Sequence, residues 1–236
     1  MKIIGHRGAA GLALENTLES IRAAKQAGVD AIEFDVRLTA DKHFVLCHDS
    51  SVSRISSHPH VIKETAAEHI GTIILNNGEQ LPTLSQALAE AGDTPVYIET
   101  KGTGWAKQLA SYLHQNKVKH ASVISFNHDE LAVFAKLLPT IPTYAIEQTR
   151  PFDVIQLARQ KHFTGIDLNF WILNPLTYWL ARRNKLKIVV YTVNSRWIAW
   201  FLSVLFPQIA ITTDNPHHLQ FLRRQHIPDS LKKKES

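Results

Sequence analysis

The strongest constraint on the fold of this chain is a regular alternation of short apolar runs with helix-like segments. Eight runs have the apolar, β-branched composition of buried strands, and they cover 2–6, 31–36, 96–100, 122–125, 143–146, 165–168, 187–192 and 210–213. The helix-like segments lie at 17–27, 83–91, 105–115, 129–138, 153–160, 175–184, 196–205 and 216–224. Eight such pairs in 236 residues predict a (β/α)8 barrel, with a doubly wound open sheet as the alternative.

The alternation is interrupted once, between the second and third predicted strands. Residues 37–82 contain a further strand-like stretch, HFVLCHD, and a polar segment, SSVSRISSHPHVIKET. A connection of this length is usually functional or an inserted subdomain. We therefore expect one barrel over 1–225, with this segment inserted after the second strand, and a basic polar tail at 226–236.

Composition narrows the classes of partner. The chain is 44% hydrophobic and 20% charged, which is typical of a soluble globular protein. Its net charge of +5 comes in large part from the C-terminal tail, and no Lys/Arg cluster is interleaved with aromatics as in a nucleic-acid groove. With one cysteine, no signal-peptide core and no apolar run long enough to cross a membrane, a cytoplasmic location is expected.

Acidic residues alternate with apolar ones in the second and third predicted strands. In AIEFDV, Glu33 and Asp35 fall on one strand face about 7 Å apart, and in VYIETKG Glu99 and Lys101 share a face. Buried carboxylates need a cation or a proton, and adjacent strands of a closed barrel would bring the three acids together. We predict a site for one divalent ion, Mg²⁺ or Ca²⁺, with ion pairs to nearby basic side chains as the structural alternative.

Two histidines are placed to serve such a site. His6 ends the first predicted strand in IIGHRG, and His48 follows FVLC. Either could exchange protons near neutral pH, and Arg7 could hold a phosphate through two hydrogen bonds. Cys47 precedes His48 and therefore faces the opposite side of the strand, so we expect a packed core thiol rather than a nucleophile.

Taken in order, these motifs resemble the glycerophosphodiester phosphodiesterase family. The resemblance rests on HRG at the first strand, ExD at the second, HD after the hairpin and ExK at the third. It continues through LPTLSQAL (81–88), YTVN (191–194) and ITTDNP (211–216), and it covers roughly residues 3–222.

The resemblance implies a metal-dependent phosphodiesterase that releases glycerol 3-phosphate and an alcohol. It implies that His6 and His48 are catalytic, and that one Mg²⁺, Ca²⁺ or Mn²⁺ is bound by three carboxylates. The implied metal ligands are Glu33, Asp35 and Glu99, and the implied substrate-binding residues are Arg7, Glu15, Lys101 and Tyr191, the last in place of the usual Trp.

The chemical route stays open at this stage. One histidine would act as base and the other as acid. The base would activate either the substrate's own glycerol hydroxyl, which gives a cyclic phosphate that water then opens, or a metal-bound water. Three carboxylates, one divalent ion, Arg7 and Lys101 sum to +1, which complements a phosphodiester monoanion.

Two alternative functions share these residues. A lysophospholipase D-like or sphingomyelinase D-like enzyme would place the same groups on the same barrel. A barrel that binds phosphodiesters without turnover is the second alternative, and the intact set of histidines and acids argues against it.

Two aromatic-rich segments, NFWILNPLTYWLARRNK (169–185) and SRWIAWFLSVLFP (195–207), have little polar face. Packing between barrel helices or a homodimer interface would account for them. Peripheral contact with a membrane through Trp197, Trp200 and Phe201 is the other interpretation, and it would favour lysophospholipid substrates. It predicts that these aromatic side chains are partly exposed.

Overall fold

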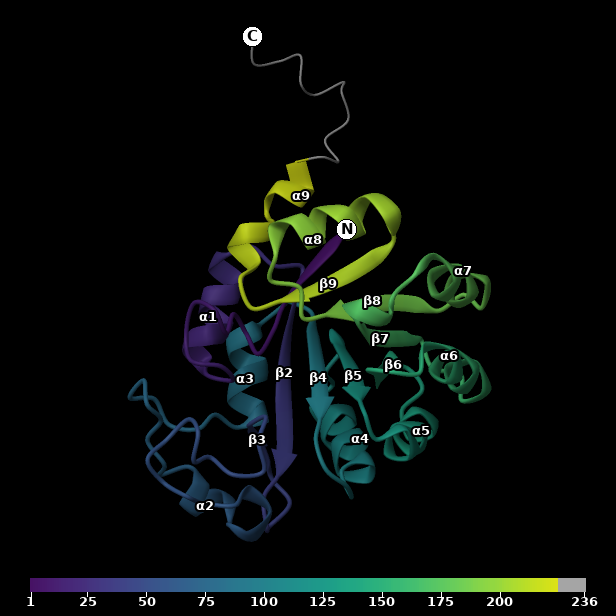
Figure 1. Ribbon diagram of the computed structural model, residues 1–236. Coiled ribbons are helices and arrows are strands. Elements are labelled where there is room, and N and C mark those ends of the chain that lie inside the picture. Colours follow the sequence, from purple (N-terminus) through teal and green to yellow (C-terminus); the bar gives the residue numbers. More distant parts are fainter. Residues whose placement is uncertain (225–236) are drawn as a thin grey trace.

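The chain forms a closed barrel of eight parallel strands surrounded by helices (Figure 1). The computed structural model describes residues 1–224. The parallel strands are β1 (Lys2–Gly5), β2 (Ala31–Leu38), β4 (Val96–Thr100), β5 (Ala121–Ser125), β6 (Thr143–Glu147), β7 (Gly165–Asn169), β8 (Lys187–Tyr191) and β9 (Ile209–Thr213). Pairing of β1 with both β9 and β2 closes the sheet, which confirms the barrel and excludes the open sheet.

The helices follow the expected order. They are α1 (Leu18–Gln26), α3 (Leu84–Ala91), α4 (Ala106–Gln115), α5 (His128–Leu137), α6 (Pro151–Gln160), α7 (Pro175–Arg183) and α8 (Arg196–Leu205). A short 3-10 turn, η2 (Phe170–Ile172), lies between β7 and α7. The predicted last helix is instead two short pieces, the 3-10 turn η3 (Pro216–Leu219) and α9 (Phe221–Arg224). The predicted tail at 226–236 lies outside the described residues.

Strand alternation places the side chains on two sides of the barrel wall. In β2, Ile32, Phe34 and Val36 join the core between strands and helices, whereas Ala31 joins the cluster inside the barrel. Because successive side chains point to opposite faces, Glu33 and Asp35 share the inward face with Ala31. The otherwise apolar strand β2 can therefore contain two acids, because both face the barrel interior.

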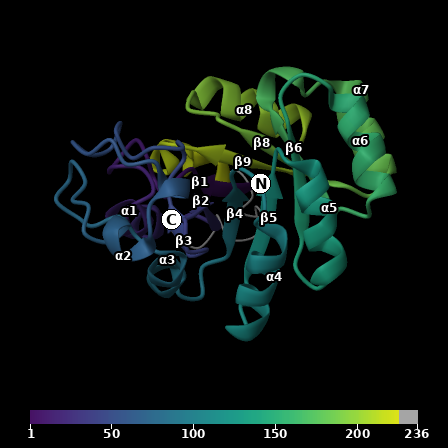
Figure 2. The ribbon, with the colours of Figure 1, turned by 90° about the horizontal axis from the view of Figure 1, so that it is seen from below.

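The inserted segment packs beside α3 at one side of the barrel (Figures 1 and 2). It contains β3 (Phe44–Leu46), antiparallel to β2, a 3-10 turn η1 (Ile62–Glu64) and α2 (Ala67–Ile70). It has an apolar cluster of its own, formed by Val45, Cys47, Val52, Ile55, Ile62, Ile70, Ile73, Leu75 and Leu81. The Cys47 side chain is buried in this cluster, as the alternation predicted.

Side-chain caps fix several helix starts near the carboxyl ends of the strands. Thr17 accepts a hydrogen bond from the Ser20 backbone N–H at 3.0 Å and begins α1, and Thr83 forms a capping box with Gln86 at α3. Within residues 1–224, none of the helices is long and apolar enough to cross a bilayer.

Candidate active site

Three buried carboxylates meet at the carboxyl ends of β2 and β4. Asp35 and Glu99 are register partners on these two strands, and Glu33 precedes Asp35 on the same inward face. One oxygen from each of the three carboxylates lies within 4.8 Å of the others. The exposed fractions of Glu33, Asp35 and Glu99 are 3%, 1% and 8%. The predicted convergence of these acids is confirmed.

The three acids differ in their partners. Asp35 lies 3.3 Å from Arg7 Nε and 3.0 Å from Lys101 Nζ, and it accepts a hydrogen bond from Asn16 Nδ2 at 2.9 Å. Glu99 contacts Lys101 Nζ. Glu33 accepts from the Arg7 backbone N–H at 2.8 Å through Oε2, whereas its Oε1 is buried without a hydrogen-bond partner.

These environments separate the pKa values of the three acids. Burial alone would raise the pKa of Asp35, but Lys101 and Arg7 lower it to about 2. For Glu99, burial and the Asp35 charge raise the pKa to about 7. Burial and the charges of Asp35 and Glu99 hold the pKa of Glu33 well above its ordinary value. The basic side chains near Glu33 and Glu99 therefore do not offset the effect of burial and of the neighbouring acids on their pKa values.

The donor set of this cluster fits a divalent ion. The group offers only carboxylate oxygens, which Mg²⁺, Ca²⁺ and Mn²⁺ prefer. A cation beside Glu33 and Glu99 would satisfy the unpartnered Glu33 Oε1 and offset the burial that raises the pKa values of both side chains. The acidic triad could therefore hold a metal ion.

His6 follows β1 and is oriented by an acid that directly follows β9. Its Nδ1 lies 2.6 Å from Asp214 Oδ1, and its Nε2 lies 4.0 Å from Glu33 Oε2. Burial would raise the pKa of Asp214, but the hydrogen bond with His6 lowers it overall. An ionised carboxylate only accepts hydrogen bonds, so the hydrogen of this contact is on His6 Nδ1. The other ring nitrogen, Nε2, faces the carboxylate cluster.

The inserted segment supplies the second histidine. His48 Nδ1 lies 2.8 Å from Asp49 Oδ1, and Asp49 in turn accepts from Arg54 Nε at 2.6 Å. Arg37 on β2 donates from Nε and Nη2 to the His48 carbonyl oxygen at 2.9 and 2.6 Å. Burial lowers the pKa of His48, so its imidazole is neutral at pH 7.

Arg7 lies in a left-handed backbone conformation, with φ 49°. This conformation is uncommon outside glycine, and it lets both Arg7 N–H and Gly8 N–H donate at 2.8 Å to Glu33, to the side chain and the backbone carbonyl respectively. A Cβ on Gly8 would lie 2.3 Å from Ser20 Oγ, so only glycine fits there. The HRG motif thus builds a turn that holds Glu33.

Glu15 lies between two guanidinium groups. It accepts from Arg7 Nη1 at 2.9 Å and from Arg54 Nη1 and Nη2 at 2.8 and 2.7 Å. The contacts continue from Arg54 through Asp49 to His48. A chain of ion pairs therefore connects the inserted segment to the turn after β1. Both oxygens of the Glu15 carboxylate thus accept hydrogen bonds from arginine side chains.

Aromatic rings stand beside the cluster. Lys101 Nζ lies 5.8 Å from the centroid of the Phe126 ring, and Phe126 packs edge-on against Tyr191 at 6.3 Å. A hollow of about 640 Å³ opens here, lined among others by Lys101, Phe126, Asn127 and His128. Tyr191, predicted to bind substrate, thus lies across Phe126 from Lys101, with its hydroxyl buried and without a hydrogen-bond partner.

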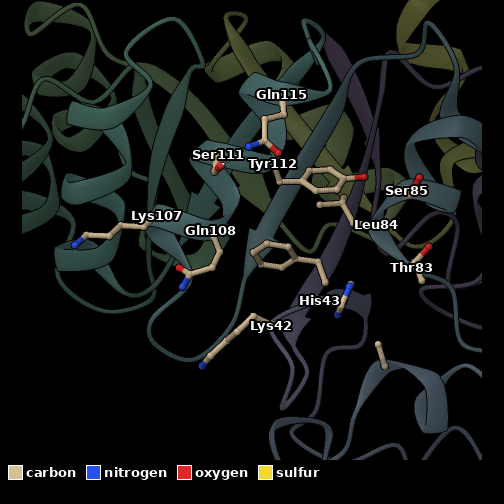
Figure 3. Close-up of a pocket in the computed structure, with 12 residues that line it drawn as sticks. Lys42, His43, Thr83, Leu84, Ser85, Lys107, Gln108, Ser111, Tyr112 and Gln115 are labelled. Carbon is tan, nitrogen blue, oxygen red and sulfur yellow. Dashed lines mark hydrogen bonds between the residues drawn. The ribbon is translucent and has the colours of Figure 1, made fainter.

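A second cavity, of about 580 Å³, lies apart from this cluster (Figure 3). Its lining comes from the β2–β3 turn, the start of α3 and one side of α4, and includes His43, Phe44, Thr83 and Tyr112. None of the predicted site residues lines it.

Several residues for which no catalytic, substrate-binding or metal-ligand role was predicted lie in or near the site. They are Asp214, which orients His6; Asp49 and Arg54, which hold His48; Asn16, which clamps Asp35; and Asp167, a buried acid on β7. Burial and the Glu99 charge hold the pKa of Asp167 well above its ordinary value. The strand-end position of Asp214 and the adjacency of Asp49 to His48 were available signals.

Comparison with known proteins agrees with this geometry. Residues 6–218 match the Glycerophosphoryl diester phosphodiesterase family. YhdW of Bacillus subtilis is 30% identical over 92% of this chain and 95% of its own length. A glycerophosphodiester phosphodiesterase of Caldanaerobacter subterraneus is 26% identical over 82% of this chain and 86% of its own.

A solved structure shares the fold over nearly the whole length. It is an Oleispira antarctica phosphodiesterase in complex with the product sn-glycerol-3-phosphate, and it superposes with a TM-score of 0.87 at 22% identity, covering 95% of this chain and 97% of the other. The family match spans far more than half of the sequence. The chain belongs to the glycerophosphoryl diester phosphodiesterase family and is a phosphodiester hydrolase.

Proposed function

We propose that this enzyme hydrolyses glycerophosphodiesters to glycerol 3-phosphate and an alcohol, with a divalent ion at Glu33, Asp35 and Glu99 and with His6 and His48 as the proton-transfer groups. The observation that carries the proposal is the placement of two carboxylate-held histidines around a buried three-carboxylate cluster.

Arg7 and Lys101 are proposed to bind the phosphate. Both side chains are mostly buried and both already contact Asp35, so they are held in place before substrate arrives. A fixed guanidinium and ammonium cost little reorganisation when the phosphate gains negative charge in the transition state. Glu15 then acts on Arg7 by fixing its guanidinium between two partners.

A metal ion at the three carboxylates would supply Lewis-acid stabilisation of the phosphate oxygens. Its support here is the unpartnered Glu33 oxygen and the raised pKa values of Glu33 and Glu99, which a neighbouring dication would lower again. Mg²⁺, Ca²⁺ and Mn²⁺ all suit this donor set.

The two histidines are proposed to move the protons. Each presents Nδ1 to a carboxylate, so Nε2 is the atom available to substrate. Because burial lowers the pKa of His48, this imidazole is neutral at pH 7 and suits the acceptor of the first proton. His6, in the form that carries a hydrogen on both ring nitrogens, then suits the donor: Asp214 holds Nδ1–H, and the Nε2 hydrogen passes to the departing alkoxide. The accepted proton comes from the glycerol hydroxyl or from water.

The test is hydrolysis of glycerophosphocholine followed by phosphorus NMR. The expected products are glycerol 3-phosphate and choline, formed with added metal and lost in EDTA. His48→Ala is expected to lower kcat about 10²- to 10⁴-fold. His114→Ala is the matched control, because His114 lies exposed on α4 and is expected to leave kcat unchanged. Phosphocholine as the product, or unchanged turnover in His48→Ala, would refute the proposal.

Lysophospholipids are the second candidate substrate class. The observation in their favour is the exposure of Trp171 and Trp197, at 78% and 82%, beside the carboxyl ends of β7 and β8. Apolar surface at this edge could accept an acyl chain. Turnover of lysophosphatidylcholine at a higher kcat/KM than glycerophosphocholine would support this candidate, and the reverse order would reject it.

A further inference from the structure

The outward side of α8 is apolar along its whole length. Trp197, Trp200, Phe201, Val204 and Leu205 recur at helical spacing, and each is 44% to 82% exposed. The inward side of the same helix is also apolar, because Ala199 and Leu202 are buried in the main core. A helix that is apolar on both sides is normally covered on both sides. The predicted exposure of these aromatics is thus confirmed.

Helix α7 extends this surface. Leu176 and Trp179 are 54% and 52% exposed on its outer side, and the Arg183 guanidinium lies 5.2 Å from the Trp179 ring centroid. Tyr178 of α7 packs against Phe206, directly after α8, with ring centroids 5.1 Å apart. The residue that follows α8 therefore packs against α7 on the outside of the barrel. The exposed outer sides of the two helices together are called the α7–α8 face.

The charged residues of the sequence stretch that contains α7 and α8 have a single sign. From residue 168 to residue 213 the sequence has no Asp or Glu, whereas it contains Arg182, Arg183, Lys185, Lys187 and Arg196. Four of the five tryptophans of the chain fall in the same stretch. By contrast, the outer side of α1 exposes Glu19, Arg22 and Lys25, the ordinary mixture for a solvated helix.

We propose that the α7–α8 face docks on the surface of an anionic lipid bilayer. Tryptophan and arginine suit the headgroup region, because the ring is amphipathic and the guanidinium can remain at the polar surface while its stem lies against apolar atoms. Apolar burial together with attraction of Lys and Arg to anionic lipid is the combination that holds interfacial helices. If a second copy docked through the same face, no acid from residues 168–213 would be available to pair with its arginines.

Docking would place the substrate entrance near the lipid. Trp171 lies in η2 directly after β7, and Trp197 lies in the first turn of α8, which residues 192–195 connect to β8. These two most exposed aromatics therefore mark the edge of the face at the carboxyl ends of the strands, where the acid cluster also lies. Because the α7–α8 face is distinct from the candidate active site, its binding to a bilayer can be tested without substrate turnover.

Vesicle sedimentation tests the proposal with the full chain. Phosphatidylcholine vesicles are compared with vesicles that contain about 30% phosphatidylglycerol. Binding is expected on the anionic vesicles and is expected to weaken with added salt. The double variant Trp200→Glu/Phe201→Glu is expected to weaken it by about 100-fold, and Arg183→Glu/Arg196→Glu by about 10-fold or more.

The matched control is Val133→Glu/Leu137→Glu on α5, where two apolar side chains are 42% and 51% exposed on a different part of the wall. This variant is expected to bind vesicles as the unaltered chain does, and circular dichroism checks that each variant folds. Absence of binding to anionic vesicles, or equal loss in the α5 variant, would overturn the proposal. So would a dimer in sedimentation that Trp200→Glu/Phe201→Glu converts to a monomer. Because no substrate is present, failure here is separate from failure of the proposed activity.

Discussion

Removal of one negative charge is predicted to have opposite effects at two neighbouring acids of the cluster. The substitutions are Asp35→Asn and Glu33→Gln, which keep the shape of each side chain. Asp35 neutralises two buried cations, at 3.3 Å from Arg7 Nε and 3.0 Å from Lys101 Nζ. Glu33 has only His6 Nε2 within ion-pair distance, at 4.0 Å, and its pKa lies well above the ordinary value. In the metal-free protein, ionised Asp35 therefore stabilises the fold and ionised Glu33 opposes it.

The magnitude for Asp35 follows from its pKa. A pKa lowered in the folded state gives stability that is present above 3.8 and is lost as pH falls toward 2. The fall from 3.8 to about 2 corresponds to about 2 kcal/mol at neutral pH. Asp35→Asn also leaves Arg7 and Lys101 without this partner, so the expected loss is about 3–5 kcal/mol. For Glu33 the sign is reversed, because a raised pKa removes stability as pH rises above the unfolded value.

Urea denaturation at pH 7 in EDTA measures both effects. Asp35→Asn is expected to lower the free energy of unfolding, whereas Glu33→Gln is expected to leave it unchanged or raise it. Both variants are expected to lose the additional stability that Mn²⁺ gives the unaltered protein. A loss of more than about 1 kcal/mol for Glu33→Gln in EDTA, or no loss for Asp35→Asn, would refute the electrostatic reasoning.

Three further predictions concern positions around the cluster. Asp214→Asn removes the carboxylate that orients His6, so kcat on glycerophosphocholine is expected to fall about 10²-fold with KM little changed, in a variant whose urea denaturation shows that it is folded at the assay temperature. A raised KM with unchanged kcat would contradict this role. The pKa of Asp167 is raised in the fold, so Asp167→Asn is expected to raise the free energy of unfolding relative to the unaltered protein as pH rises above 4, by up to about 1.4 kcal/mol per pH unit. A constant difference in the free energy of unfolding between the two proteins across this pH range would contradict this. Ile62→Ala, in the fully buried core of the inserted segment, is expected to cost about 2–5 kcal/mol in urea denaturation, and a loss below about 1 kcal/mol would mean that this segment unfolds separately from the barrel.

The barrel and its acid cluster could be predicted because both follow from local periodicity. Alternation within AIEFDV and VYIETKG fixed which side chains share a strand face, and barrel topology made β2 and β4 neighbours. The same reasoning predicted that Cys47 is buried away from the cluster. Such features depend on spacing within a few residues, which a sequence displays directly.

The partner of His6 and the contacts around Asp35 and Arg54 depend on tertiary structure. Asp214 lies 208 positions from His6 and joins it only because β9 pairs with β1. Asn16 adopts φ 57° directly before the Thr17 cap of α1 and donates a hydrogen bond to Asp35. Neither contact produces a repeating pattern in the sequence from which it could be predicted. The link from His48 through Arg54 to Glu15 likewise requires the folded position of the inserted segment.

The most direct test of the central claim is a metal titration of the stripped enzyme. After EDTA treatment and removal of the chelator, Mn²⁺ is added stepwise while glycerol 3-phosphate release from glycerophosphocholine is recorded. No release is expected at the start, and the rise is expected to end at one ion per chain; Glu99→Gln is expected to show no rise. Full activity of the stripped enzyme, or normal metal activation of Glu99→Gln, would contradict the central claim.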